Sequence, residues 1–171
     1  VEEGSVVIRH PSALGNGALT VLASSRLTLD IGSQPIALTD LTLAATATLD
    51  LGAAALTITS PTLVVSDLRE VLSEAAPGRI VSSAADASEA IGYAANPQNH
   101  MVLQIARPGD TQLDSHVNFD DILALFPNYN AATDASWSDG DFTYDGVVNF
   151  DDILALFPNY GLANREWFVT S

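Results

Sequence analysis

Oxygen-bearing side chains recur at alternating positions in two twelve-residue segments toward the end of the chain. The segments are DTQLDSHVNFDD (110–121) and DFTYDGVVNFDD (141–152), and each carries such residues at positions 1, 3, 5, 9 and 12. A hard cation such as Ca²⁺ takes about six to eight oxygen ligands, so a chain that binds it must wrap around it with alternate residues facing inward. The spacing therefore predicts two Ca²⁺-binding loops of the EF-hand type.

The predicted ligands are the side chains at those five positions and the backbone carbonyl at position 7. In the first loop they belong to Asp110, Gln112, Asp114, His116, Asn118 and Asp121. In the second loop they belong to Asp141, Thr143, Asp145, Val147, Asn149 and Asp152. Position 6 must turn sharply and favours glycine, which is Gly146 in the second loop but Ser115 in the first. We therefore expect two Ca²⁺ sites, of which the second is the stronger.

The same thirteen residues, VNFDDILALFPNY, follow position 7 of both loops, at 117–129 and at 148–160. The spacing within FDDILALF predicts a short helix with an apolar face, which Pro127 and Pro158 end or kink. That face consists of Ile122, Leu123, Leu125 and Phe126, and again of Ile153, Leu154, Leu156 and Phe157. Val117 and Val148, at position 8, are expected to pair the two loops through a short β contact. A merely solvated acidic surface would explain neither the shared register nor the helices.

Two calcium loops, each followed by a short helix and with no clear helix before the loop, resemble a dockerin. The resemblance covers about residues 107–162 and implies a cohesin-type protein partner. It also implies that loop positions 10 and 11 help to select that partner, and these are Phe119, Asp120, Phe150 and Asp151. Because the pair is the same in both copies, two equivalent binding faces are expected. With the preceding β-rich part, the chain also resembles the C-terminal end of large secreted, planctomycete-type bacterial proteins.

The first part of the chain alternates apolar with small or hydroxyl residues, which is typical of half-buried strands. LTLDIG (27–32) and ATLDLG (47–52) match at an offset of 20, as in the coils of a parallel β-solenoid. An antiparallel sheet or sandwich would give the same alternation. Asp30, Asp40 and Asp50 are better interpreted as residues that close strands at turns than as a carboxylate ladder for cations or sugars.

After these strands the period changes. SDLREVLSEAAPG (66–78) predicts a helix, ADASEAIGYA (85–94) a second short helix, and residues 96–109 a linker. The predicted fold class is mixed β then α. A β-solenoid-like or β-sheet region over 1–105, with short helices at its end, precedes a small α-helical dockerin-like domain over 106–171.

Charge restricts the partners. Six arginines, no lysine and 21 acidic residues give a net charge of −15, which repels nucleic acid and anionic membranes. Residues 106–171 hold eleven acidic residues and two arginines, a net −9 that two Ca²⁺ ions would partly neutralise. No apolar run is long enough for a transmembrane segment. A mature or partial secreted chain, located outside the cell or at its surface, is expected.

Motifs for catalysis are missing, including HExxH, G-x-S-x-G, a P-loop and a cysteine nucleophile. Trp137 and Trp167 flank the second unit and are expected to pack rather than to form a sugar platform. The sequence thus favours a non-catalytic, secreted calcium-binding module that docks a protein or stabilises a cell-surface protein. Two alternatives stay open. One is the accessory C-terminal piece of an extracellular polysaccharide-degrading enzyme, and the other is a β-solenoid adhesin or structural surface protein.

Overall fold

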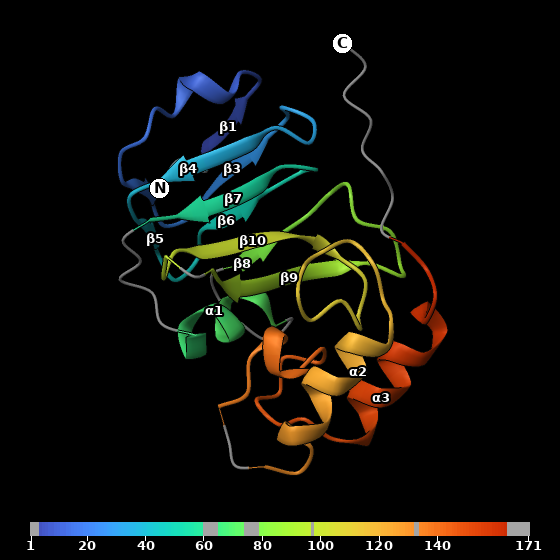
Figure 1. Ribbon diagram of the computed structural model, residues 1–171. Coiled ribbons are helices and arrows are strands. Elements are labelled where there is room, and N and C mark those ends of the chain that lie inside the picture. Colours follow the sequence, from blue (N-terminus) through green and yellow to red (C-terminus); the bar gives the residue numbers. More distant parts are fainter. Residues whose placement is uncertain (1–3, 60–64, 74–78, 97, 132–133, 164–171) are drawn as a thin grey trace.

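A computed structural model describes residues 4–59, 65–73, 79–96, 98–131 and 134–163 of the chain (Figure 1). Its strands are β1 (Gly4–Ile8), β2 (Leu19–Val21), β3 (Ser25–Leu29), β4 (Pro35–Leu38), β5 (Leu41–Leu43), β6 (Thr48–Asp50), β7 (Ala55–Ile58), β8 (Arg79–Val81), β9 (Ala90–Ala95) and β10 (Met101–Ala106). Its α-helices are α1 (Val65–Leu72), α2 (Phe119–Leu125) and α3 (Phe150–Leu156). Short 3₁₀ helices are η1 (Pro11–Ala13), η2 (Phe126–Asn128), η3 (Trp137–Asp139) and η4 (Phe157–Asn159).

Parallel strands from successive stretches of the chain stack beside one another in the first sheet, in the order β1-β3-β6-β8. The register places Val6 opposite Leu27, Leu27 opposite Leu49, and Leu49 opposite Ile80. These residues form one apolar row that runs across the strands, and Leu49 is fully buried within it. Stacking is what buries the row, because a single strand offers each apolar side chain neighbours only along its own length.

The other sheets close the core. The order of the second sheet is β4-β7-β10-β9, in which β4 and β7 are parallel while β10 runs antiparallel to both of its neighbours. A third, two-stranded sheet pairs β2 with β5 in parallel. Alternate residues of β4 and β7 are buried, as period-2 patterning requires. The strand prediction therefore holds for these segments, and the sheets are parallel in one part and mixed in another.

Two local predictions in this half are wrong. The segment expected to form a second helix overlaps β9, and the segment expected to be a linker contains β10. The two strands pair over six residues, from Met101 opposite Ala95 to Ala106 opposite Ala90. Gly92 allows close packing on this sheet, since a Cβ there would lie 2.4 Å from a methyl group of Leu113. Cross-strand packing decides the conformation of the alanine-rich segment, whatever its helix propensity.

The predicted fold class is also wrong. Most regular structure is β-sheet, and the three α-helices of the described residues are short, with eight residues in α1 and seven in each of α2 and α3. The repeated units do not make a small α-helical domain, because most of each unit is loop and its helix gives way to a 3₁₀ turn at Pro127 or Pro158. Such short helices contribute too few hydrogen-bonded turns to be stable without tertiary packing.

The repeated units pack against the sheet through the segment between them. The indole of Trp137 is fully buried, and its Nε1 donates a 2.7 Å hydrogen bond to the backbone carbonyl of Asp110. The Tyr144 hydroxyl donates to Ile91 O at 2.9 Å and accepts from Ile91 N at 3.2 Å, which joins the second loop to β9. Trp137 also contacts Phe142 edge to face, with ring centroids 5.0 Å apart. One buried aromatic cluster therefore connects both loops to the β-sheet.

A buried carboxylate connects the turns of the first sheet. Asp50 is 1% exposed, and its Oδ1 accepts from the backbone N–H of Gly52 and of Ser83 at 3.0 and 2.9 Å. Its Oδ2 accepts from Arg26 at 2.7 Å. Burial alone would raise the pKa of Asp50, but the hydrogen bonds from Ser83, Gly52 and Arg26 outweigh it and lower that pKa. Asp50 thus closes a turn, as the strand-closing interpretation predicts.

We predict that Asp50→Asn lowers the free energy of unfolding by about 1–3 kcal/mol, because a carboxamide cannot accept all three hydrogen bonds. The matched control is Asp30→Asn, which removes the exposed pair of Asp30 with Arg9 at 3.2 Å. That change is expected to stay within about 0.5 kcal/mol. Urea unfolding at neutral pH measures both, and equal losses in the two variants would contradict the role given to Asp50.

Candidate metal centre

Position 1 of each loop is a buried carboxylate that accepts hydrogen bonds from backbone N–H groups of the same loop. Asp110 Oδ1 accepts from Asp114 N and its Oδ2 from Ser115 N, both at 3.0 Å. Asp141 repeats this arrangement with Asp145 N at 3.1 Å and Gly146 N at 2.9 Å. Neither carboxylate is exposed to solvent. The first half of each loop is therefore folded around its position-1 aspartate.

Position 12 connects the end of each loop to its beginning. Asp121 Oδ1 accepts from Thr111 N at 2.9 Å, and Asp152 Oδ1 accepts from Phe142 N at 2.8 Å. The second oxygen of each accepts from the backbone N–H of position 9, Asn118 or Asn149. Both position-12 carboxylates are buried, and both form a capping box that starts the following helix. One residue type thus closes the loop and nucleates the helix.

Positions 5 and 9 hold the turns in the second half of each loop. Asp114 Oδ1 accepts from His116 N and Asp145 Oδ1 from Val147 N, both at 2.9 Å. The position-9 side chains serve as helix N-caps: Asn118 Oδ1 accepts from the N–H of Asp120, and Asn149 Oδ1 accepts from that of Asp151.

Position 3 distinguishes the two loops. In the second loop Thr143 Oγ1 lies 3.5 Å from Asp141 Oδ1, so it faces the position-1 carboxylate. In the first loop Gln112 is exposed and lines a hollow beside β9 and β10 together with Gln104. The oxygen set is therefore drawn together more completely in the second loop.

The electrostatics of these carboxylates are unfavourable without a cation. Burial, together with the Asp121 and Asp114 carboxylates, raises the pKa of Asp110 to about 6 despite the opposing backbone N–H groups. Burial and the carboxylates of Asp152 and Asp145 likewise raise the pKa of Asp141 to about 6. Burial also raises the pKa of Asp152. Folding thus places negative charge where water solvates it poorly, a cost that a bound cation would offset.

The donor set fits a hard cation in its chemistry. Each loop offers carboxylate, carboxamide or hydroxyl, and backbone carbonyl oxygens, which Ca²⁺ prefers. Among the described residues, no three acidic or histidine side chains gather at one point as a metal cluster. The carboxylates at positions 1, 5 and 12 each bind a different part of the loop backbone. Position 1 accepts from the N–H groups of positions 5 and 6, position 5 from that of position 7, and position 12 from those of positions 2 and 9. A Ca²⁺ ion would be held by the oxygens of the predicted positions.

The turn at position 6 explains why the loops differ. Ser115 has φ +75° and Gly146 has φ +86°, a left-handed conformation that costs a non-glycine residue about 1–2 kcal/mol. A Cβ at Gly146 would also lie 2.9 Å from the guanidinium carbon of Arg69. Arg69, in α1, donates to Ala135 O and to Asp134 Oδ1, both at 3.2 Å. The second loop therefore lies against α1, and its glycine avoids both the strain that Ser115 bears in the first loop and a close approach to Arg69.

The two units are connected reciprocally rather than through the expected contact between Val117 and Val148. Val117 O accepts from Gly161 N at 2.8 Å, after α3, and Val148 O accepts from Asn130 N at 2.8 Å, after α2. The prediction that position 8 pairs one loop with the other is wrong in this detail. Each loop instead pairs with the segment that leaves the other unit's helix, an arrangement with pseudo-twofold symmetry.

Two asparagines also connect each unit to the other. Asn128, after α2, donates to Asp139 O at 3.1 Å, just before the second loop. Asn159, after α3, donates to Pro108 O at 2.9 Å, just before the first loop. Both also donate to a carbonyl of their own helix, at Ala124 and Ala155. Each asparagine therefore joins its own unit to the other.

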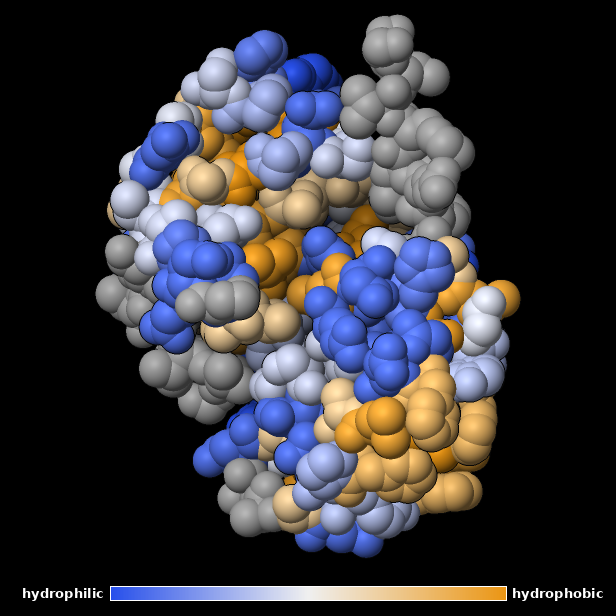
Figure 2. All heavy atoms as spheres, in the orientation of Figure 1, coloured by the Kyte–Doolittle hydropathy of each residue, from blue (hydrophilic) through white to orange (hydrophobic). Residues whose placement is uncertain are grey.

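The repeated helices leave an apolar surface uncovered. Figure 2 shows apolar side chains gathered over α2 and α3. Phe119 and Phe150 are each 58% exposed, and Leu123 and Leu154 are each 52% exposed. Phe126 and Phe157 are 59% and 61% exposed and, with the partly buried isoleucines, line a small apolar hollow of about 100 Å³ between the helices. Only Leu125 and Leu156 of the predicted apolar faces are buried in the core.

The residues predicted to select a partner lie on this surface. Phe119, Phe150, Asp120 and Asp151 are exposed at the N-terminal ends of α2 and α3. The sequence alone did not single out Leu123, Phe126 and their counterparts as surface residues, because their helical spacing equally suits a buried face. The equal exposure of the paired residues shows that the two copies present the same surface. Such apolar patches on folded proteins mark interaction sites.

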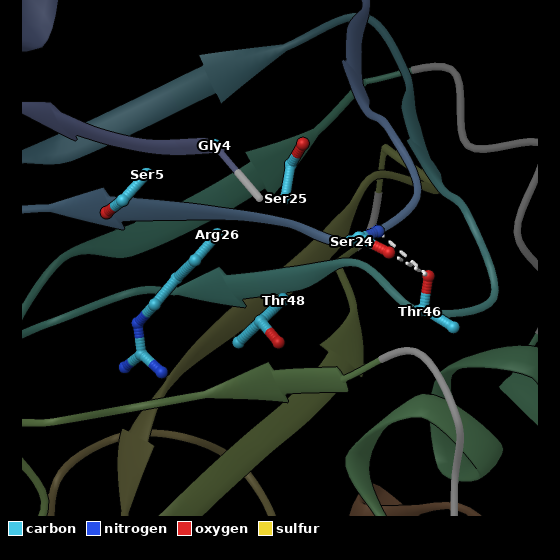
Figure 3. Close-up of a pocket in the computed structure, with 7 residues that line it drawn as sticks. All are labelled: Gly4, Ser5, Ser24, Ser25, Arg26, Thr46 and Thr48. Atoms are coloured by element: carbon cyan, nitrogen blue, oxygen red, sulfur yellow. Dashed lines mark hydrogen bonds between the residues drawn. The ribbon is translucent and has the colours of Figure 1, made fainter. Parts of the chain in front are cut away.

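A second hollow, of about 420 Å³, lies on the outer side of the first sheet (Figure 3). Hydroxyl-bearing side chains and Arg26 line it, and Ser24 N donates to Thr46 Oγ1 at 2.8 Å. Its one charged side chain, Arg26, already pairs with Asp50 at 2.7 Å. The hollow therefore lacks the paired carboxylates or the nucleophile–base pair that catalysis needs.

The chain was compared with family models, curated proteins and solved structures. No family model, curated protein or solved structure matches the chain.

Trp137 is buried and so forms no sugar platform, and Trp167 lies outside the described residues. Within the described part of the chain, no helix has both the length and the apolar character that crossing a bilayer requires.

We predict that Ser115→Gly stabilises the protein by about 0–1.6 kcal/mol. Glycine removes the left-handed strain of about 1–2 kcal/mol, and about 0.4–1 kcal/mol of this is lost to the greater entropy of the unfolded chain. Gly146→Ala is the reciprocal variant and should destabilise, since it adds that strain and crowds Arg69. Thermal and urea unfolding at one fixed calcium concentration compare the two, and a stabilising Gly146→Ala would contradict this account of the turn.

Proposed function

We propose that this chain is a non-catalytic calcium-binding module, with one Ca²⁺ held in each loop and the second loop binding more tightly. The observation that carries the proposal is the pair of matching networks around the buried carboxylates of Asp110 with Asp121 and of Asp141 with Asp152. A solvated acidic surface would not bury these groups or surround them twice with the same backbone N–H groups.

Calcium would act on stability through charge. Two ions add +4 to a part of the chain that carries −9 and offset the desolvation of the buried carboxylates. Because the ions bind only the folded loops, the free energy of unfolding should rise with calcium concentration. Extracellular modules of this kind bind Ca²⁺ at about 10⁻⁴–10⁻³ M, which suits a secreted or cell-surface protein.

We further propose that the apolar surface over α2 and α3 docks a protein partner, of the cohesin type that the dockerin resemblance implies. Its support is the repetition of exposed Phe119, Leu123 and Phe126 as Phe150, Leu154 and Phe157 at nearly equal exposure. The capping boxes that begin both helices use Asp121 and Asp152. Calcium at the loops would therefore fix the helices that carry this surface.

The first test is calorimetric titration of the whole chain with Ca²⁺. We expect two binding events, and Asp152→Asn should weaken the tighter event by at least about tenfold, since it removes a charged oxygen ligand. Asp121→Asn should instead weaken the other event and leave the tighter one in place. Asp151→Asn and Asp120→Asn are matched controls, because they remove the same charge from exposed neighbouring positions.

Absence of binding heat, together with a melting temperature that is the same in calcium and in chelator, would refute calcium binding. Equal losses in Asp152→Asn and Asp121→Asn would refute only the ranking of the loops. Equal losses in the control variants would show that general charge, rather than ligation, governs the affinity.

The docking proposal predicts a difference between single and double substitution. If a cohesin module binds through either of two equivalent faces, Leu123→Asp or Leu154→Asp alone should lower its apparent affinity by about twofold, through the loss of one of two equivalent sites. The double variant should lose binding, since a charge then lies in both apolar faces. Titration of cohesin modules, with and without calcium, measures this, and full binding by the double variant would contradict the proposal.

A further inference from the structure

Arg69 of α1 reaches from the β region to the second loop. Leu68 and Leu72, one helical turn apart, are buried in the core and anchor α1 there. Arg69 follows Leu68 directly, and its side chain is only 18% exposed. Its contacts with Asp134 and Ala135 place α1 beside the segment that leads into the second loop (Figure 1). The guanidinium is therefore held in position by a helix of the β region.

Arg69 and Ala135 hold the turn of the second loop from two sides. A Cβ at Gly146 would lie 2.9 Å from the guanidinium carbon of Arg69 and 3.0 Å from its Nη1, so this planar group covers the turn at position 6. Nη1 also donates to Ala135 O at 3.2 Å. Ala135 N in turn donates to Gly146 O at 3.0 Å. The three residues Arg69, Ala135 and Gly146 thus form one closed set of contacts, which we call the clamp.

The clamp acts on the part of the loop that orients a predicted ligand. Gly146 N donates to Asp141 Oδ2 at 2.9 Å, so the residue that Arg69 covers also fixes the position-1 carboxylate. Ser115, at the same position of the first loop, donates to Asp110 in the same way. Ser115 is exposed, however, whereas Gly146 is buried. The clamp therefore distinguishes two loops whose internal hydrogen bonds are alike.

The charge of Arg69 is matched beside the loop. Its Nη2 lies 3.2 Å from Asp134 Oδ1, and the side chain of Asp134 is 75% exposed. The paired carboxylate and the surrounding water both reduce the repulsion that a cation in the loop would feel from the guanidinium. Arg69 therefore acts on the loop mainly through contact and hydrogen bonding rather than through net charge.

Holding the turn matters because an ion-free loop tends to open. The buried carboxylates of Asp141 and Asp152 repel each other when no cation lies between them. A cation binds the closed loop, so the apparent affinity falls with the fraction of ion-free protein in which the loop is closed. A contact that keeps the turn in place before the ion arrives therefore raises the affinity.

We propose that Arg69 is a positioning residue for calcium in the second loop. It holds the turn at Gly146 against Ala135 and so keeps the loop closed for the ion. The inference rests on the calcium binding proposed above, and it makes the affinity of the second loop depend on the β region. Because coupling between two sites is reciprocal, calcium in the second loop in turn stabilises the contact with α1.

Calorimetric titration of the whole chain with Ca²⁺ tests the sign of the effect. Arg69→Met removes the guanidinium and should weaken the second-loop event, identified by its weakening in Asp152→Asn, at least about fivefold. Arg69→Lys keeps the charge but cannot cover the turn and bond both partners at once, so it should weaken the same event. The first-loop event is the internal control and should stay within about twofold. Arg9→Met removes an exposed arginine elsewhere and should leave both events as in wild type.

Hydrogen exchange provides a measurement that a merely structural role would not change. In wild type, Ca²⁺ should slow exchange at Ser73 N, which donates to Arg69 O at the end of α1. In Arg69→Met the ion should still slow exchange at Gly146 N but should leave Ser73 N unchanged. Melting curves in chelator set a temperature at which every variant is folded.

Four outcomes would overturn the inference while leaving calcium binding in place. Tighter binding by the second loop in Arg69→Met would show that the guanidinium mainly repels the ion. An unchanged second-loop event, or equal weakening of both events, would reduce Arg69 to a general support of the fold. Wild-type affinity in Arg69→Lys would show that a positive charge alone is enough. Absence of binding heat in wild type would instead refute the proposed calcium binding, and the inference with it.

Discussion

Burial of negative charge is the constraint on which the second half of this protein depends. The carboxylates of Asp110, Asp121, Asp141 and Asp152 lie inside the fold, where each accepts hydrogen bonds from backbone N–H groups. Backbone dipoles supply only partial positive charge, so the pKa values of Asp110 and Asp141 stay raised. The loops, the helix starts and the exposed apolar surface all follow from how these four groups are held.

The same constraint explains why the two units behave as one. Asn128 and Asn159 each donate across to the other unit, and Val117 and Val148 each pair with the segment after the other helix. Trp137 then attaches the pair to the β-sheet through Asp110 O and the aromatic side chains of the second loop. The two loops are thus joined to each other and to β9 through packed contacts and hydrogen bonds rather than through a flexible connection.

The sequence pattern predicts those helices and strands that are determined by residues close together in the chain. The helix over Phe119–Leu125 follows from an asparagine N-cap, an aspartate three residues later and apolar spacing, all of which are visible in the sequence. The period-2 strands up to β7 follow from alternation in the same way. These strands do stack in parallel, but Leu27 lies opposite Leu49, an offset of 22 residues, whereas the repeat of Leu27–Gly32 at Ala47–Gly52 has an offset of 20.

Other features depend on contacts between distant residues and left no local signal. The alanine-rich β9 has only a short alternation, with Ile91 and Tyr93 between small residues, and is a strand because β10 pairs with it and Trp137 covers it near Gly92. Val117 and Val148 each pair with the segment that follows the helix of the other unit, because both units share one core. The spacing of residues within one unit does not encode that contact. The prediction of a small α-helical domain was wrong because the helical pattern in each unit is real but ends after two turns.

The exchanged asparagines also bear on how such a duplication is inherited. Recombination between the two identical thirteen-residue segments would delete 31 residues and leave one loop with one helix. That shortened chain would hold no second unit, so its asparagine would keep only the acceptor in its own helix. The contacts that the two units exchange would be lost together, and a single helix of seven residues has too few hydrogen-bonded turns to be stable without such packing. The duplication is therefore structurally meaningful only as a pair.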